Sequence, residues 1–161
     1  MSDVPADRLN EVGVLTRREI EARIVGPLVE RLSAEFGAER VHAIVRDEII
    51  EIARRQGAAM AESVGANDIG SFTVALAAWS KDGALETEMV ELSEERLAFN
   101  VTRCKYAELY RSLGLAELGA TLSCNRDGAL MEGFNPSVEF RRTQTIMGGA
   151  THCDFDYRVK P

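Results

Sequence analysis

Cysteine, histidine and tryptophan are all scarce in this chain, which has three cysteines, two histidines and one tryptophan in 161 residues. Three cysteines cannot form a complete set of disulfides, so we expect free thiols, each open to a catalytic, metal-binding or core role. Long apolar runs are missing too, because no stretch approaches the about 18 residues that a membrane span requires. The first residues lack the basic start and apolar core of a secretory signal, so we expect a cytoplasmic protein with no membrane partner.

Positive charge is also in short supply. The chain has 19 lysines and arginines against 26 aspartates and glutamates, a net charge of -7. Because phosphate contacts need a basic surface, we expect no nucleic-acid partner and a small-molecule substrate instead. Gly-rich phosphate loops, the Gly-x-Ser-x-Gly elbow, His-Glu-x-x-His and Cys-x-x-Cys are absent as well. The sequence therefore gives no support to the enzyme families, redox pairs and zinc knuckles that these motifs define.

What is present fits an ordinary globular domain. Hydrophobic residues make up 45% and charged residues 28% of the chain, which is typical of a folded domain of this length. A domain of this size buries roughly two-thirds of the surface of its unfolded chain. We predict a single domain over residues 1–161, with a flexible N-terminal segment over about residues 1–15.

The first half of the sequence predicts helices. Apolar residues recur at every fourth position from 20 to 36, which predicts an amphipathic helix over about residues 17–36. Gly26-Pro27 should kink or restart it. A second stripe predicts a longer antiparallel helix from about residue 41 to residue 64, and Asp68 is placed to cap a third helix. The apolar stripe of the first helix consists of Ile20, Ile24, Leu28, Leu32 and Phe36.

The second half changes to the two-residue period of strands. Short helices are expected between two hairpins, one over about residues 105–113 and one from 116 to beyond 124. Helices first and antiparallel strands later predict an α+β fold, with the N-terminal helices packed on one face of an antiparallel sheet of about four strands. The predicted strands lie at residues 85–92, 97–102, 138–145 and 151–159.

Reactive side chains gather in the last third of the chain. Cys104 follows a predicted strand and begins a predicted helix, with Arg103 and Lys105 beside it. A helix N-terminus and two cations both favour a thiolate, so this thiol should have the lowest pKa; the alternative is a small residue at a packed junction. The candidate catalytic residues are Cys104, Cys124, Cys153, Asp127 and His152.

Cys124 and Asp127 are three residues apart, so on a helix they share a face. A carboxylate alone does not activate a thiol and raises its pKa, so a cation such as Arg126 or His152 would be needed. The alternative is a core cysteine and a helix-end aspartate.

His152 and Cys153 are adjacent, and on a regular strand they point to opposite faces. Strand alternation therefore disfavours a dyad of these two residues unless a bulge re-aims one of them. Cys153 should face the helices, whereas His152 needs a partner elsewhere or is a surface residue.

Arginine side chains near the predicted strands could bind a substrate carboxylate, because guanidinium groups match carboxylates in two-point contacts. Cross-strand salt bridges are the alternative. The candidate substrate-binding residues are Asn100, Arg103, Glu132, Asn135 and Arg142.

From about Arg18 to Tyr157 the chain resembles the L-2-amino-thiazoline-4-carboxylic acid hydrolase family. The resemblance implies a hydrolase that acts on a carbon-nitrogen bond of a small cyclic amidine or amide. Water would add to the ring carbon and the ring would open to an N-carbamoyl amino acid. The blocks that carry the resemblance, in order, are residues 99–108, 113–119, 124–127, 133–136, 142–147 and 149–155.

This reaction requires a nucleophile or activated water, a proton donor for the leaving group, and a cation for the substrate carboxylate. A cysteine, with Asp127 or Glu132 and an arginine, could fill these roles. No cofactor is predicted, and a divalent metal is an alternative activator of water.

The C-terminal half is also similar in layout to 4-vinyl reductase domains, small-molecule sensors that hold zinc through cysteines. Cys124 and Cys153 match the metal ligands of that domain, and Arg142 and Thr145 occupy the other two positions. The similarity implies that Cys124 and Cys153 approach each other, although two ligands do not complete a zinc site. A non-catalytic sensor domain is therefore the alternative function. In either case the N-terminal helices could form the interface of a homo-oligomer.

Overall fold

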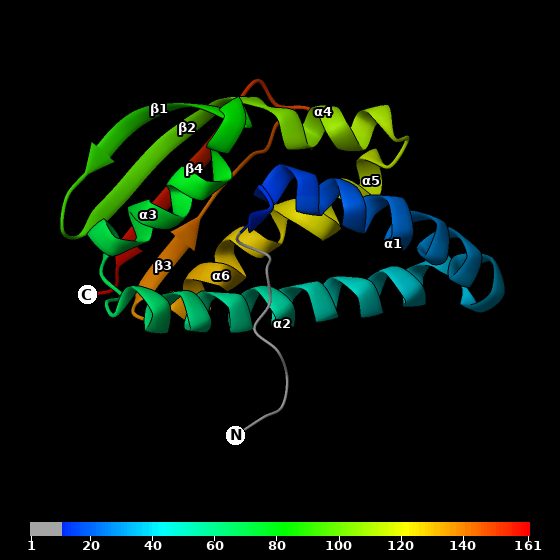
Figure 1. The fold of residues 1–161 in the computed structure, drawn as a ribbon, viewed down its shortest axis with the longest axis horizontal. Coiled ribbons are helices and arrows are strands. Elements are labelled where there is room, and N and C mark those ends of the chain that lie inside the picture. The colour runs from blue at the N-terminus through cyan, green and yellow to red at the C-terminus, as the bar shows by residue number, and fades with distance from the viewer. Residues whose placement is uncertain (1–10) are drawn as a thin grey trace.

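The computed structural model describes residues 11–161, apart from the side chain of Ala75. Its four strands form one antiparallel sheet in the order β1-β2-β4-β3, with helices packed on one face (Figure 1). This confirms the predicted α+β class. The strands are β1 (Leu85–Leu92), β2 (Arg96–Cys104), β3 (Val138–Arg141) and β4 (Cys153–Val159). The longer helices are α1 (Val14–Phe36), α2 (Ala38–Val64), α3 (Ile69–Trp79), α4 (Lys105–Ser112) and α6 (Arg126–Phe134).

The flexible segment predicted over about residues 1–15 falls only partly within the described residues. Residues 1–10 lie outside the described residues, and α1 begins at Val14, about three residues before the predicted start. Asp68 caps α3 as predicted, because its Oδ1 accepts a hydrogen bond from the backbone N–H of Ser71 at 3.0 Å. Among the described residues, no helix is both long and apolar enough to cross a membrane.

The apolar stripe that predicted α1 does not face the core. Its five side chains are 42–60% exposed, and the helix packs through the opposite face, where Ala22 and Gly26 are buried. A Cβ on Gly26 would come within 2.8 Å of the Leu115 side chain, so the small residues set the contact distance. Hydrophobic periodicity located the helix, but side-chain size decided which face packs.

The helix does not restart at Gly26-Pro27, because α1 is one continuous helix with Pro27 inside it. Proline removes one backbone donor, which would have bonded to the carbonyl four residues earlier. That residue, Arg23, lies on the exposed side of the helix, where water can satisfy its carbonyl.

Helices α2 and α6 approach each other unusually closely. A Cβ on Gly57 of α2 would lie 1.9 Å from the carbonyl oxygen of Leu130, and a Cβ on Gly133 of α6 would lie 1.9 Å from that of Arg54. Only glycine fits at these two positions without a backbone shift. The contact fixes the position of α6, whose first turn faces the cavity described below.

The sheet packs against the helices through alternate residues, as predicted. Cys153, Phe155 and Tyr157 of β4 are buried, while the residues between them are partly exposed. Phe99 of β2 lies opposite Phe155 in the register, and their rings stack at 4.8 Å. His152 and Cys153 therefore do not form a dyad on this strand.

The second hairpin is shorter than predicted. β3 ends at Arg141 rather than residue 145, and β4 begins at Cys153 rather than residue 151. The Asp154 carboxylate accepts hydrogen bonds from the backbone N–H groups of Thr143 at 3.0 Å and Gln144 at 2.9 Å. These bonds hold the chain away from the ladder, so residues 142–152 form a long connection.

The short helix predicted from residue 116 to beyond residue 124 is divided into three parts. It begins with α5 (Ala116–Gly119), continues as a π-helical turn over Ala120–Cys124, and ends in α6. Single π turns inside helical stretches often occur at functional sites. Here the turn ends at Cys124, which lines the cavity two residues before α6 begins.

Candidate functional site

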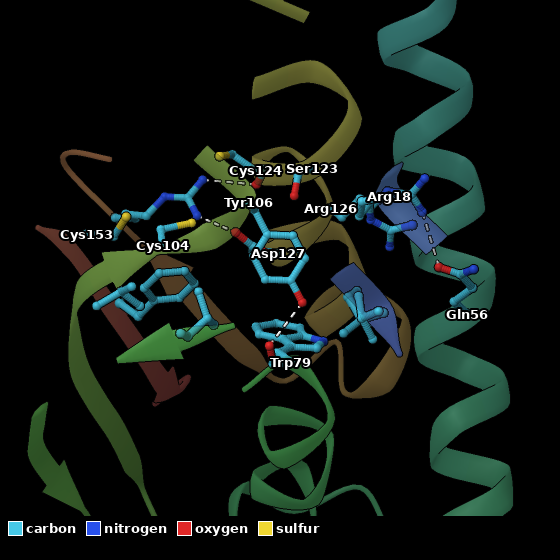
Figure 2. Close-up of a pocket in the computed structure, with 16 residues that line it drawn as sticks. Arg18, Gln56, Trp79, Cys104, Tyr106, Ser123, Cys124, Arg126, Asp127 and Cys153 are labelled. Atoms are coloured by element: carbon cyan, nitrogen blue, oxygen red, sulfur yellow. Dashed lines mark hydrogen bonds and ion pairs between the residues drawn. The ribbon is translucent and has the colours of Figure 1, made fainter. Parts of the chain in front are cut away.

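A cavity of about 80 Å³ lies between the helices and the end of the sheet where β2 ends and β4 begins. One water molecule needs about 10–15 Å³ on this measure, so the cavity has room for several waters or one small ring. Side chains from five helices, from the π-helical turn and from three strands reach it, namely α1, α2, α3, α4 and α6 with β1, β2 and β4 (Figure 2). Its lining is mixed, with aromatic and aliphatic walls around a few charged groups.

Half of the sequence-predicted site residues meet in this cavity. The three thiols come from three separate elements, and Figure 2 shows them with Asp127 around the cavity. Arg142 lines it as well. These five residues are Cys104, Cys124, Cys153, Asp127 and Arg142.

The other predicted residues lie elsewhere. His152 is half-buried beside Gln144, whose amide nitrogen is 3.2 Å from its Nε2 atom, and it does not line the cavity. Asn100 lies on the face of the sheet that points away from the helices, in register with Asp154. Neither residue is brought to the thiols: Asn100 lies on the outward face of β2, and His152 precedes β4 and contacts Gln144.

The three remaining candidates make structural contacts outside the cavity. Arg103 is exposed and donates to Glu108 at 2.8 Å. Glu132 pairs with Arg54 at 2.8 Å, which ties α6 to α2. Asn135 donates from its amide to the backbone carbonyl of Asn67 at 2.8 Å and accepts from a turn N–H, so it joins two loops.

Asp127 and Arg142 form the central ion pair of the cavity. Arg142 donates through Nη1 to Oδ2 of Asp127 and through Nη2 to the carbonyl oxygen of Cys124 at 3.0 Å. The side chains are only 17% and 12% exposed. Burial raises the pKa of Asp127, and the Arg142 charge offsets part of that rise. The carboxylate is thus held in place beside the cavity with its proton affinity increased.

The prediction of a low pKa for Cys104 was wrong. Burial raises its pKa to about 11, although its sulfur accepts a hydrogen bond from the Ala107 N–H at 3.4 Å as the N-cap of α4. The two neighbouring cations turn away, since Arg103 pairs with Glu108 and Lys105 donates to the Asp82 carbonyl oxygen at 3.1 Å. Sequence adjacency therefore did not bring the positive charges to the thiol.

The other two thiols behave in the same way. Burial raises the pKa of Cys124 to about 12, and the Asp127 carboxylate adds to that rise. Burial also raises the pKa of Cys153, whose sulfur accepts from the Ile146 N–H at 3.2 Å. All three thiols keep their protons at neutral pH.

Two further arginines line the cavity, and no motif in the sequence indicated that they are buried. Arg18 and Arg126 are only 7% and 6% exposed. Arg18 donates to both carboxylate oxygens of Glu21, at 2.7 and 2.9 Å, and Arg126 donates to one of them at 3.2 Å. Figure 2 shows Arg18 and Arg126 close together next to Gln56 of α2, which accepts a bond from Arg126 at 3.4 Å.

The signals for these arginines were weak. Arg18 begins a row of small residues, Ala22 and Gly26, which is the face of α1 that packs. For Arg126 the sequence indicates only a cation near Cys124, and its position in the sequence does not indicate burial. Burial and, to a smaller extent, the charge of Arg18 lower the pKa of Arg126 to about 10, so it remains protonated at neutral pH.

The metal alternative has few ligands to draw on. Cys124 and Cys153 line the same cavity, so two thiols are available there. Across residues 11–161, no cluster of three or more His, Cys, Asp or Glu side chains is arranged to hold a metal ion. A structural zinc site takes four protein ligands, so these residues do not fit one.

Solved structures share this fold at low sequence identity. The phenol-responsive sensory domain of the transcription activator PoxR, solved with phenol, is 12% identical and has a TM-score of 0.55, covering 84% of this chain and 72% of that one. Subunit 3 of a trafficking protein particle complex from Naegleria fowleri, covalently bound to palmitic acid, is 11% identical with a TM-score of 0.52, covering 91% and 96%. These similarities concern the fold alone.

Comparison with curated proteins finds no match for this chain. The sequence model of the L-2-amino-thiazoline-4-carboxylic acid hydrolases, by contrast, matches residues 17–157. That span includes both buried arginines, all three thiols and the Asp127–Arg142 pair. The chain therefore belongs to the L-2-amino-thiazoline-4-carboxylic acid hydrolase family.

Proposed function

We propose that this protein hydrolyses a small carboxylate-bearing cyclic amidine of the 2-amino-thiazoline type, and that the reaction takes place in the cavity described above. Family membership supplies the reaction class, ring-opening hydrolysis. The cavity volume of about 80 Å³ suits a single five-membered ring better than an extended chain.

The observation that carries the proposal is the charge of the cavity. Arg18 and Arg126 share one carboxylate, that of Glu21, while Arg142 is matched by Asp127. These described groups leave one buried positive charge in excess, and a buried charge without a partner is costly. A substrate carboxylate would neutralise it through two-point contacts of the kind that guanidinium groups favour.

Asp127 is our candidate for the general base. It lies in the cavity, Arg142 orients it, and its raised pKa makes it a better proton acceptor than an ordinary aspartate. Water would give its proton to Asp127 as its oxygen bonds to the ring carbon. The protonated Asp127 would then return that proton to the heteroatom that leaves when the ring opens.

The atoms balance for either ring bond. If the bond between the ring carbon and sulfur breaks, the product is an N-carbamoyl amino acid with a free thiol, so the N-carbamoyl product expected from the sequence corresponds to cleavage of this bond and not of a ring carbon-nitrogen bond. If the bond between the ring carbon and nitrogen breaks, the product is an S-carbamoyl amino acid with a free amine. One water molecule is consumed in both cases, so the product identifies the bond.

Water is the favoured nucleophile because burial keeps the cavity thiols protonated. We assign Cys104, Cys124 and Cys153 to the wall of the site. Single replacements of these cysteines by serine separate the two routes. Substantial activity in all three variants supports attack by water, whereas an almost complete loss in one variant and a covalent adduct on that cysteine in the wild type would assign the attack to the thiol.

A sensor domain without turnover is the second candidate. The observation in its favour is the shared fold with a sensory domain solved with phenol. Such a domain would bind a small ring in the same cavity and release it unchanged.

A product assay distinguishes the two functions. Purified protein is incubated with 2-amino-thiazoline-4-carboxylate, and products are followed by mass spectrometry and a thiol reagent. We expect catalytic formation of a product heavier by one water. Saturable binding of the ring with no product over long incubation would favour the sensor and contradict the hydrolase.

A further inference from the structure

The proposed function leaves the exposed apolar stripe of α1 unused. We call it the α1 ridge, and it consists of Ile20, Ile24, Leu28, Leu32 and Phe36. Its members are 42–60% exposed. At 1.5 Å per residue the ridge runs about 24 Å along the helix, and isolated monomers rarely leave such a continuous apolar row uncovered.

A row of side chains spaced by four residues can pack against a row of the same spacing on another helix. Rows of this spacing interdigitate with the same rows on another helix at a crossing angle of about -50°, the commonest packing of helices in globular proteins. A second copy of this chain presents that row. A two-fold axis near Leu28, the middle of the ridge, would place each half of one ridge against the opposite half of the other.

The charges around the ridge permit two copies to meet. Helix α1 is electrically neutral, although the chain as a whole carries a net charge of -7. Two neutral faces approach each other without the repulsion that other surfaces of an acidic protein would create. The charged residues of α1 are Arg17, Arg18, Arg23 and Arg31 against Glu19, Glu21, Glu30 and Glu35.

The other exposed apolar surface is less suited to self-association. Val74 of α3 and Met89 of β1 are 62% and 58% exposed beside the edge strand. Between residues 86 and 95 that hairpin carries five glutamates; two of them, Glu86 and Glu91, pair with arginines of β2, and acidic side chains remain in excess there. Charged edge strands resist pairing, and two copies of this face would repel each other.

The exposed area is also of the right order. The ridge presents on the order of 500 Å² of apolar surface, and a standard interface buries roughly 800 Å² from each partner, with the difference supplied by a polar rim. We propose that the α1 ridge is the two-fold interface of a homodimer. The opposite face of the same helix carries Arg18 into the cavity, so dimerisation would bury the outer side of a helix that forms part of the site.

Molar mass in solution tests this inference independently of any activity. Light scattering on a sizing column should give twice the 17.7 kDa of one chain for the wild type. Ile24→Glu combined with Leu28→Glu should give a monomer with an unchanged circular dichroism spectrum, because both side chains are already exposed. Val74→Glu, on the other apolar surface, should remain a dimer. A monomeric wild type, or a dimer that survives the double substitution, would overturn the proposal.

A crosslink tests the geometry without relying on a charged variant. In Leu28→Cys, two copies of residue 28 should lie near the two-fold axis and form an intermolecular disulfide on mild oxidation. Val74→Cys serves as the matched control and should remain uncrosslinked. Equal crosslinking of the two variants, or none at residue 28, would rule out this interface.

Discussion

At the scale of single residues, buried charge determines the chemistry of the cavity. Three arginines and one aspartate line it, and one glutamate outside the lining contributes a further negative charge. Each buried guanidinium has lost much of its hydration, so an anion that enters the cavity replaces missing water contacts as well as charge. The thiols, kept neutral by burial, add a weakly polar wall.

The arginine pair should determine which rings are accepted. Arg18→Gln should raise KM for the carboxylate-bearing ring by roughly 10- to 100-fold, the value of one or two charge-assisted hydrogen bonds, with little change for 2-aminothiazoline, which lacks the carboxylate. Steady-state kinetics on both compounds give the ratio. The control is Arg23→Gln on the exposed side of the same helix. An unchanged preference in Arg18→Gln would show that the carboxylate binds elsewhere.

The raised pKa of Asp127 predicts a particular pH profile. A general base must be deprotonated, so kcat/KM should fall with decreasing pH through the pKa of Asp127 in the free protein. Because burial raises that pKa, the fall should occur above the ordinary aspartate value of about 4. The same raised pKa affects stability. Because Asp127 holds its proton more tightly in the folded protein than in the unfolded chain, the free energy of unfolding should decrease as pH rises from the unfolded pKa through the folded pKa. A flat profile down to pH 4 would contradict the role of Asp127.

Some site residues could be identified from sequence, and others could not. Spacing predicted that Cys124 lies near Asp127, and both line the cavity; Cys153 lines it too, whereas His152, which precedes β4, does not. The burial of Arg18 and Arg126 could not be predicted, because burial of a charged residue depends on contacts between distant segments, here α1, α2 and the start of α6. The lowered pKa expected for Cys104 failed for a related reason, as its neighbours in sequence bind other groups.

At the scale of elements, the close approach of α2 and α6 holds the site in place. Asp127 is in the first turn of α6, and glycines allow the two helix backbones to touch. Bulky apolar residues predicted where α1 and α2 lie, but small residues decided how they pack. In α1 the face with Ala22 and Gly26 packs against the rest of the protein, and the α1 ridge on the other face is therefore exposed.

Removing one glycine should loosen this contact. Gly57→Ala should lower the free energy of unfolding by at least about 2 kcal/mol, because its Cβ would overlap the carbonyl oxygen of Leu130 at 1.9 Å and the backbones must separate. Urea denaturation measures the change. Ala59→Ser, at an exposed position of the same helix, should change it by no more than about 0.5 kcal/mol. A stable Gly57→Ala protein would mean that the helices can adjust without cost.

At the scale of the whole molecule, the order of helices and strands was enough to predict the α+β class. It was not enough to predict where β3 ends or how the stretch from residue 116 to residue 134 is divided. The β3 strand ends early because Asp154 takes backbone donors of Thr143 and Gln144 out of the ladder. The stretch from residue 116 to residue 134 is divided by a π turn, which no simple period predicts. Both irregular segments contribute residues to the cavity lining, Arg142 after β3 and Cys124 at the end of the π turn. Local departures from regular structure are expected at functional sites.

The central claim is that Asp127 drives ring opening in this cavity. The most direct test compares turnover of 2-amino-thiazoline-4-carboxylate by the wild type and by Asp127→Asn, with Glu132→Gln as the control, since that exposed residue pairs with Arg54 outside the site. We predict that Asp127→Asn loses about 10²- to 10⁴-fold in kcat, the usual contribution of a general base, while Glu132→Gln retains wild-type turnover. A folded Asp127→Asn protein that opens the ring at the wild-type rate would contradict the account.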